Sequence, residues 1–373
     1  MANKTARLGD LATYINGYAF KPADWGDTGL PIIRIQDLTG NSYQLNRYDG
    51  EYPERIEVND GDVLISWSAS LGVYVWQRGK ALLNQHIFKV VFDKLPVNKD
   101  YFVFAVEHKL AEMESKTHGA TMKHIVKKDF DGTTIPYPPI EKQAEIADHL
   151  RRITSLIDRQ TEQLLLLDQL VKSRFIELFG DPQRNPHGYK HTKLSDIATY
   201  YNGLTYKPEN VAAEGTIVLR SSNIQNSQLD FADTVRVDCA IKERLMVQKN
   251  DILMCSRNGS AKLVGKVALI KDIQEPMSFG AFMMIIRSHY FGYLMTYFQM
   301  DAFRQQIKTG ATTTINQITG RMLDDVTIPL PSMSLVDQFA TFVEQTDKSK
   351  LAVQKGLQEL EILKKSLMQQ YFG

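Results

Sequence analysis

The feature that most constrains this chain is an internal duplication. The segment at residues 8–40 aligns without a gap with the segment at residues 194–226, and both carry the pattern NGxxxKP. A second alignment pairs residues 131–180 with residues 324–373, and both of these segments end in Phe-Gly. The duplication predicts two similar modules with pseudo-twofold symmetry, and such an object is suited to a partner with two-part geometry.

The composition is that of an ordinary globular protein. The chain has 373 residues, more than a typical single core, and the duplication divides it near residue 185. Hydrophobic residues make up 43% and charged residues 23%. The net charge of +1 gives no global attraction to nucleic acid. Basic residues cluster locally at residues 116–128 and 242–271, which favours either phosphate contacts or ordinary solvated surface.

Nothing in the sequence indicates a membrane protein or a disulfide-linked protein. The longest aliphatic run, at residues 164–167, is far too short to span a bilayer, and the first residues lack the apolar stretch of a signal peptide. Cys239 and Cys255 form neither a disulfide framework nor a CxxC metal site. We therefore expect a cytoplasmic protein without membrane contacts.

Each half begins with a segment that we interpret as an α+β domain. Short apolar runs separated by Gly, Asn and Asp predict strands at residues 30–35, 62–66, 87–92, 216–219, 251–254 and 282–286. Helices are expected at residues 101–116 and 291–308. The domain boundaries that follow are residues 1–138 and 181–331.

A proline-rich segment then ends each domain, at residues 135–140 (IPYPPI) and 328–333 (IPLPSM). Beyond it, apolar residues recur with a period of about 3.5, the spacing of a coiled coil. In residues 139–180 the row is Ile146, Leu150, Ile153, Ile157, Leu164, Leu167 and Val171, interrupted at Gln160; in residues 332–373 it includes Phe339, Val343, Leu357 and Leu360.

A helix over residues 141–178 would be about 57 Å long, more than one small domain can cover. The pattern predicts that the two helices pack against each other as an antiparallel coiled coil that joins and spaces the two domains. The alternative is that each helix folds back on its own domain.

Signatures of catalysis are missing from the sequence. It contains neither GxGxxG nor HExxH. Two segments, ending at Gly79-Lys80 and Gly265-Lys266, resemble phosphate loops but have the wrong spacing and lack the following Ser or Thr. The histidines are too scattered for metal ligation. The sequence therefore favours a binding protein with no catalytic residue and no metal site.

The chain resembles the specificity subunit of type I restriction–modification systems over nearly its whole length. The resemblance is strongest in PYPPIEKQAEIADHL with LLLLDQLVKSRFIELFGDP, and in PLPSMSLVDQFATFV with LQELEILKKSLMQQYFG. It extends to LGDLATYINGYAFKP and LSDIATYYNGLTYKP, and to GDVLISWSAS and NDILMCSRNG. One departure is that Gln143 corresponds to Val336, so a contact made by Gln143 cannot be assumed in both halves.

The resemblance implies two target recognition domains that read the halves of a split, asymmetric sequence in double-stranded DNA. It implies that the helices dock two methyltransferase subunits, and that restriction (translocase) subunits join in the full complex. Adenine N6 methylation and ATP-driven cleavage would then take place on those partners. S-adenosylmethionine, ATP and Mg²⁺ would be bound by the partners, and no cofactor by this chain.

Base reading requires amide, guanidinium and hydroxyl groups on loops. Three pairs of matching loops supply candidates: Arg34, Gln36 and Asp37 with Arg220, Ser222 and Asn223; Trp67, Ser68 and Ser70 with Arg257, Asn258 and Ser260; and His118, Thr121, Lys123 and His124 with Thr312, Thr313 and Thr314. Arg34 and Arg220 recur in both halves, which favours a shared salt bridge or phosphate contact over base reading. Trp67 is equally consistent with a core residue.

Two other functions remain open on the sequence. The first is a self-contained restriction endonuclease or methyltransferase on the same tandem scaffold, against which the missing catalytic motifs argue. The second is a scaffold that does not bind nucleic acid, for which the nearly neutral charge is the best support.

Overall fold

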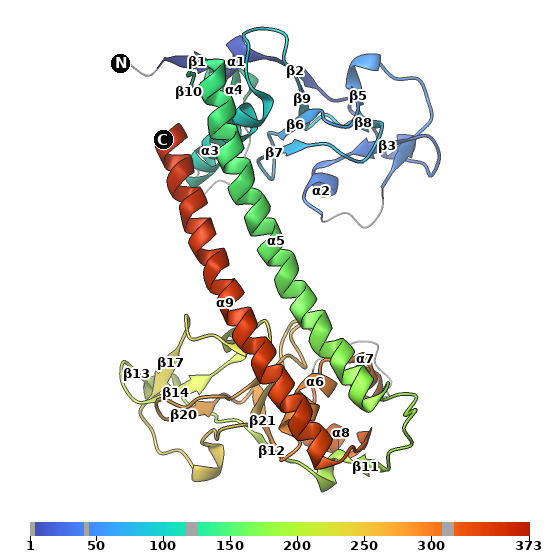
Figure 1. The fold of residues 1–373 in the computed structure, drawn as a ribbon, viewed down its shortest axis with the longest axis vertical. Helices are drawn as coiled ribbons and strands as arrows, with labels where there is room; N and C mark the ends of the chain where they lie inside the picture. Colours follow the sequence, from blue (N-terminus) through green and yellow to red (C-terminus); the bar gives the residue numbers. More distant parts are fainter. Residues whose placement is uncertain (1–3, 41–44, 117–125, 308–316) are drawn as a thin grey trace. The chain divides into compact units, whose positions relative to one another are not determined.

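The computed structural model describes residues 4–40, 45–116, 126–307 and 317–373. Contacts divide the chain into two units. Unit 1 comprises Met1–Glu162 and Gln354–Gly373, and unit 2 comprises Gln163–Val353. Two long helices, α5 (Ile140–Phe179) and α9 (Met333–Phe372), contribute one part to each unit (Figure 1). Both helices that the apolar period predicted are therefore present.

Unit 1 contains two four-stranded sheets. The first is antiparallel, in the order β2 (Thr13–Asn16), β9 (Ile87–Val91), β6 (Val63–Ser66) and β7 (Gly72–Val75). The second has the order β4 (Arg47–Tyr48), β3 (Leu30–Ile33), β8 (Ala81–Leu83) and β5 (Glu57–Val58), and β3 is parallel to β8. A further pair joins β1 (Thr5–Arg7) to β10 (Thr134–Pro136), and the helices are α1 (Leu8–Leu11), α2 (Ile35–Leu38), α3 (Lys99–Lys116) and α4 (Lys127–Gly132).

Unit 2 repeats this plan. One sheet is β12 (Thr199–Asn202), β21 (Met283–Arg287), β18 (Ile252–Cys255) and β19 (Val267–Leu269). The other is β13 (Val211–Ala212), β17 (Val235–Val237), β14 (Thr216–Leu219) and β20 (Met277–Phe279), again with one parallel pair, β14 with β20. Short pairs join β11 (His191–Lys193) to β22 (Thr327–Pro329) and β15 (Ile224–Gln225) to β16 (Gln228–Leu229), and the helices are α6 (Phe291–Tyr297), α7 (Asp301–Ile307) and α8 (Gly320–Asp324).

One expected element is wrong. The helix predicted over residues 291–308 is two helices, α6 and α7, because the intervening backbone makes tight turns. The amide of Gln299 donates to the carbonyl of Thr296 and that of Met300 to the carbonyl of Tyr297. The break lets Phe303 pack edge-on against Phe298, with ring centroids 4.8 Å apart. Such edge-to-face aromatic contacts are favourable, and this one is made across the break.

In unit 1 the long helices form part of the hydrophobic core. Ile146 and Leu150 of α5 lie in the same buried cluster as Met368 and Phe372 of α9. The Phe372 ring packs against Tyr101 of α3, with centroids 5.2 Å apart. The early part of α5 therefore pairs with the end of α9, and both also pack on the globular part of their unit.

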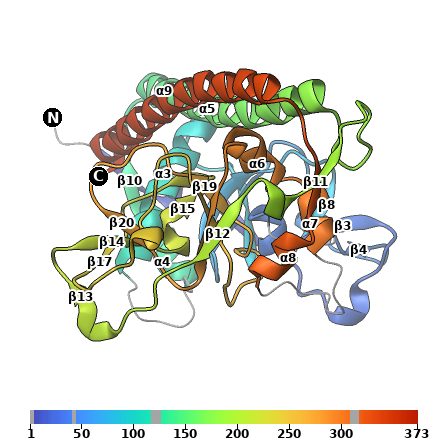
Figure 2. The same ribbon diagram turned by 90° about the horizontal axis from the view of Figure 1, so that it is seen from below.

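In unit 2 the end of α5 pairs with the start of α9. Phe175 and Phe179 near the end of α5 contact Phe339 near the start of α9, with ring centroids 5.6 and 5.3 Å apart. Tyr293 of α6 lies 5.0 Å from both α5 rings, and Figure 2 shows α6 beneath the paired helices. The helices are thus antiparallel partners, as predicted. The alternative, in which each helix folds back on its own domain, is wrong, because α5 and α9 contact each other in both units.

Two glutamine side chains of α5 lie inside unit 1, and only Gln143 has hydrogen bonds to both ends of its amide, because the buried Gln160 Oε1 has none. Gln160, which interrupts the apolar row, lies against Gly356 of α9: a Cβ at Gly356 would be 3.0 Å from the Gln160 amide nitrogen. Gln143 is buried; its side-chain oxygen accepts from the Asn98 amide at 3.0 Å and its side-chain nitrogen donates to the Pro138 carbonyl at 2.9 Å. Its role is structural, and the matching Val336 in unit 2 is simply an apolar core residue.

Candidate functional site

Both units build the same backbone frame around one turn, which connects β8 to β9 in unit 1 and β20 to β21 in unit 2. Gly17 and Gly203 approach this turn so closely that a Cβ would lie 2.0 Å from the carbonyl oxygen of Asn84 or 2.1 Å from that of Gly280. The next residues form equivalent parallel bridges to Asn84 and Gly280. Only glycine permits this approach, which explains the Asn-Gly in both copies of the repeat.

In unit 2 this frame encloses a pocket of about 380 Å³, within the range of small-ligand sites. Three segments line it: the loop after β12, the 3-10 turn at Ser221–Asn223, and the turn between β20 and β21. The lining residues are Leu204, Thr205, Tyr206, Arg220, Ser221, Ser222, Gly280, Ala281, Phe282 and Met283. The pocket thus combines one cation, several hydroxyl groups and two aromatic rings.

Two of the candidate residues are buried caps. Asp37 accepts a hydrogen bond from the Arg34 amide at 2.8 Å, and Asn223 accepts one from the Arg220 amide at 2.8 Å. The Asn223 side-chain nitrogen also donates to the carbonyls of Asp230 and Asp233. Because both side chains are buried and engaged in holding the turn, we remove Asp37 and Asn223 from the proposed contact surface.

The recurring arginines each contact a carboxylate of their own unit. Arg34 lies 3.5 Å from Asp37 and over the Trp25 ring, with its guanidinium carbon 5.6 Å from the ring centroid. Arg220 lies 2.7 Å from Asp233. These contacts support the shared structural role that their recurrence suggested. Their neighbours Gln36 and Ser222 are exposed.

The loops after β6 and β18 occupy equivalent places in the two units. Their residues correspond with a shift of one position from the sequence alignment. Ser66 pairs with Ile87 and Cys255 with Met283, so Ser66 matches Cys255. Trp67 therefore corresponds to Ser256, and Ser68 to Arg257; the sequence alignment of Trp67 with Arg257 is wrong. The cause is that the β-ladder, not the loop sequence, sets which residues face each other.

The residues of these loops have distinct environments. Trp67 is half-buried and stacks on Phe88, with centroids 5.5 Å apart and the rings inclined by 22°. Its surroundings therefore match those of a core residue at one edge of the domain. Ser68 and Ser70 order their own loop, since their carbonyls accept from the Ser66 hydroxyl at 3.3 and 2.6 Å.

The loop of unit 2 is tied to the pocket. Asn258 donates to the Ser221 hydroxyl at 3.3 Å and accepts from the Ser260 amide at 2.9 Å. Arg257 is exposed and lies over the Phe282 ring, 5.6 Å from its centroid. Of the candidate residues, Arg257 and Ser222 therefore lie on the same surface as Phe282. The remaining candidates, His118, Thr121, Lys123, His124, Thr312, Thr313 and Thr314, lie outside the described residues.

The sequence reasoning missed Phe282 and its counterpart His86. Residues 282–286 were expected to be a strand, but β21 begins at Met283 and leaves Phe282 on the turn, 59% exposed. The available signal was Gly280, since glycine is a typical turn residue and lies two positions before Phe282.

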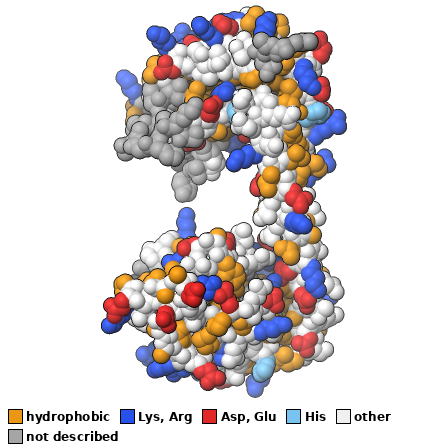
Figure 3. Space-filling view, turned by 90° about the vertical axis from the view of Figure 1, so that its left-hand side faces the viewer, with side chains coloured by type: hydrophobic (Ala, Val, Ile, Leu, Met, Phe, Trp, Pro, Cys, Tyr) orange, Lys and Arg blue, Asp and Glu red, His pale blue; other side chains and the backbone are white. Residues whose placement is uncertain are grey.

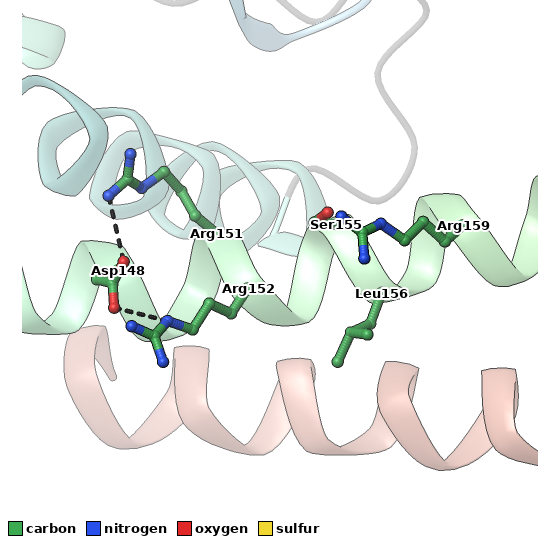
Figure 4. Close-up of a pocket in the computed structure, with 6 residues that line it drawn as sticks. All are labelled: Asp148, Arg151, Arg152, Ser155, Leu156 and Arg159. Atoms are coloured by element: carbon green, nitrogen blue, oxygen red, sulfur yellow. Dashed lines mark hydrogen bonds and ion pairs between the residues drawn. The ribbon is translucent and has the colours of Figure 1, made fainter.

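A second surface lies on α5 within unit 1. A shallow depression of about 500 Å³ is lined by Asp148, Arg151, Arg152, Ser155, Leu156 and Arg159 (Figure 4). Asp148 pairs with Arg152 at 2.8 Å and with Arg151 at 3.4 Å. Arg159 makes no ion pair with any described residue. The surface is therefore basic.

The long helices also expose apolar side chains. On α5 these are Ile140, Leu156, Leu165, Leu166, Leu170 and Ile176, and on α9 they are Met333, Leu351, Ile362 and Leu363. Leu165 is 60% exposed and Leu166 is 54% exposed. Single apolar side chains are common on protein surfaces, but the neighbouring Leu165 and Leu166 place an apolar area in contact with water.

Catalytic features were not found in the described part of the chain. Across residues 4–40, 45–116, 126–307 and 317–373, no group of three or more His, Cys, Asp or Glu side chains could hold a metal ion. Burial raises the pKa of the Cys255 thiol, which keeps it neutral and a poor nucleophile. No helix in these residues is long and apolar enough to cross a membrane.

Basic and acidic side chains are interspersed on the face shown in Figure 3.

Comparison with known proteins gives consistent results. A family model described as the type I restriction modification DNA specificity domain matches residues 2–167 and 186–362. The specificity subunit of the Escherichia coli type I restriction enzyme EcoBI is 24% identical over 73% of this chain, and the match covers 62% of that subunit. The MjaVIII specificity subunit of Methanocaldococcus jannaschii is 24% identical over 98% of this chain and 91% of its own length.

Solved structures agree on the fold. The crystal structure of the type I restriction-modification S subunit from M. genitalium superposes with a TM-score of 0.58 at 15% identity, covering 99% of this chain and 96% of that one. A chain from a study of complex assembly in the type I system gives a TM-score of 0.57 at 16% identity, with coverage of 99% and 97%.

Proposed function

Because the chain belongs to the type I restriction modification DNA specificity family, and is a DNA specificity subunit of such a system, we propose that its two units bind the two halves of a bipartite, asymmetric DNA target. Unit 1 would read one half through its loops and unit 2 the other. A covalent tandem of two different readers suits a target whose halves differ, whereas identical subunits suit a palindrome.

One observation supports this proposal above the others. The two units use the same backbone frame around the turn at Asn84 and Gly280, but they display different side chains on it. Ser68 in unit 1 is replaced by Arg257 in unit 2, and His86 by Phe282. A frame that is kept while its exposed side chains change is suited to reading two different sequences, because hydrogen-bonding and apolar groups on the loops select bases.

We place the chemistry on partner subunits. The exposed leucines of α5 and the exposed apolar residues of α9 would dock two methyltransferase subunits, one for each half of the duplicated chain. S-adenosylmethionine, ATP and Mg²⁺ would be held by the methyltransferase and restriction subunits. The isolated chain would be catalytically silent and poorly soluble, since its docking surface would be exposed to water.

The direct test is to express the chain with its methyltransferase and map methylated adenines across the host genome. We expect a single motif with two defined parts separated by a non-specific spacer. The purified chain alone, incubated with DNA, S-adenosylmethionine and Mg²⁺, should neither methylate nor cut. Modification or cleavage by the chain alone would instead support a self-contained enzyme.

The docking surface can be tested separately. Replacing Leu165 and Leu166 by Glu adds charge to side chains that already face solvent, so the fold should persist while methyltransferase binding falls by roughly tenfold or more. A matched control is Glu162→Gln, which changes an exposed residue of the same helix without touching the apolar side chains. Equal methyltransferase binding by the leucine variant and wild type would exclude this surface as the docking site.

A further inference from the structure

We infer that Phe282 is a specificity-determining residue of unit 2, and that it selects a base pair containing thymine by packing on the thymine methyl group. The structurally equivalent His86 selects one base pair in the other half of the target through its polar ring. This inference rests on the proposed function, since it names the side chains that distinguish the two half-sites.

The backbone at Phe282 is held more firmly than a typical turn. Its carbonyl oxygen accepts hydrogen bonds from the Ser256 amide at 2.9 Å, the Arg257 amide at 3.0 Å and the Ser256 hydroxyl at 3.0 Å. Gly203 also packs closely on the turn, and its amide donates to the Met283 carbonyl at 3.1 Å. A side chain presented on such a rigid turn meets a ligand with little loss of conformational entropy.

The surroundings of the Phe282 ring favour DNA as its partner. The Arg257 guanidinium lies over the ring, and the Arg220 guanidinium lines the same pocket. The exposed Arg257 provides phosphate attraction next to this apolar contact, whereas the charge of Arg220 is offset by Asp233 at 2.7 Å. In the major groove the thymine methyl group is the apolar feature that distinguishes one base pair from the others, and phenylalanine is one of the side chains that contact it.

His86 occupies the same place in unit 1 with different chemistry. Its carbonyl accepts from the Trp67 amide at 3.5 Å, the counterpart of the Ser256 bond in unit 2. Its ring is exposed, packs against Trp67 with centroids 5.5 Å apart, and lies within hydrogen-bond distance of the Gln85 amide nitrogen at 3.2 Å. An imidazole flanked by an amide offers hydrogen bonds to a base edge, in contrast to the apolar ring of Phe282.

The test uses the chain in complex with its methyltransferase and compares Phe282→Ala, His86→Ala and Ile273→Ala. Ile273 is also an exposed apolar residue of unit 2. It comes after Leu269, at the end of the β18–β19 pair that lies away from the Arg257 loop. We expect Phe282→Ala to relax one A·T position in one half-site by roughly tenfold or more, and His86→Ala to relax one position in the other half-site. Ile273→Ala should leave the motif unchanged.

A second arm removes the methyl group from the DNA. Replacing thymine by uracil at the relaxed position should weaken binding of the wild-type complex by a similar factor and leave the Phe282→Ala complex unaffected. An unchanged motif in Phe282→Ala, relaxation in the same half-site as His86→Ala, or insensitivity to uracil would overturn the inference. If the wild-type complex showed no two-part motif at all, the proposed function itself would fail.

Discussion

Unit 1 and unit 2 keep the same strand order in their antiparallel sheets and the same close backbone contacts, yet they differ in the side chains displayed around their shared turn. Gly17 and Gly203 approach equivalent carbonyls, and Asp37 and Asn223 cap equivalent turns. By contrast, His86 and Phe282 stand on the same turn with unlike chemistry. The comparison teaches that buried positions such as Asp37 and Asn223 hold the frame even where the residue differs, whereas exposed positions that differ are the better candidates for recognition.

The largest effect is expected from filling the glycine contact. Gly203→Ala would place a Cβ 2.1 Å from the Gly280 carbonyl oxygen, which accepts a hydrogen bond from the Met283 amide within the turn and would have to shift. We expect unit 2 to lose more than about 3 kcal/mol of stability. Hydrogen-exchange mass spectrometry of both units in one chain measures this, because unit 1 serves as the internal reference.

The control for this substitution is Gly259→Ala, since a Cβ at Gly259 meets no atom within 4 Å. The reciprocal substitution Gly17→Ala should destabilise unit 1 and spare unit 2. Unchanged protection in both glycine variants would show that the close approach is not what the two units share.

A smaller loss is expected from exchanging the caps. Asn223→Asp would turn a carboxylate oxygen toward the carbonyls of Asp230 and Asp233, which now accept hydrogen bonds from the Asn223 amide. We expect a loss of about 2–3 kcal/mol in unit 2. Asp37→Asn keeps an acceptor for the Arg34 amide and should cost about 1 kcal/mol in unit 1. Equal losses, measured by the same exchange experiment, would contradict the different environments of the two caps.

A third difference is an ion pair found at only one of two equivalent positions. Arg287 contacts Asp251 at 2.7 and 2.8 Å, and these hydrogen bonds raise the pKa of the Arg287 guanidinium. The position equivalent to Arg287 in unit 1 is Val91, because each pairs with the first residue of β12 or β2. Arg287→Met should cost about 2 kcal/mol, since it strands the buried Asp251 carboxylate, whereas Val91→Met should cost less than 1 kcal/mol. Chemical denaturation of the two variants would show whether Arg287→Met loses more stability than Val91→Met.

The smallest effect is expected from charged contacts of the long helices. Lys350 of α9 pairs with Asp168 of α5 at 2.5 Å in unit 2, and Lys364 of α9 pairs with Glu107 of α3 at 3.5 Å in unit 1. Asp168 and Glu107 are exposed, so Asp168→Asn and Glu107→Gln should each cost less than about 1 kcal/mol. Screening by salt should reduce both costs, which can be checked by thermal unfolding at low and high ionic strength.

The sequence predicted the architecture well because that information is periodic and duplicated. The row from Ile146 to Val171 predicted α5, and the matching row predicted α9, since a 3.5-residue apolar period is typical of helices that pack along each other. The break between α6 and α7 could not be predicted, because it depends on Phe298 and Phe303 meeting in three dimensions.

The candidate site was only partly predictable. The sequence identified Arg257 and Ser222 as polar loop residues, and the structure shows them beside the pocket or its turn. It could not show that Asp37 and Asn223 point inward, because a cap and an exposed polar residue look alike in sequence. The pairing of Trp67 with Arg257 was wrong by one residue, since register is set by the ladder between strands.

The central claim is that each recognition domain reads its own half of the DNA target. The most direct measurement replaces residues 181–331 with the equivalent domain of a relative, expresses the hybrid with the methyltransferase, and maps the methylated motif across the genome. The account predicts that one half of the motif changes to that of the relative while the other half is retained. A motif altered in both halves, or unchanged in both, from an active hybrid would contradict it.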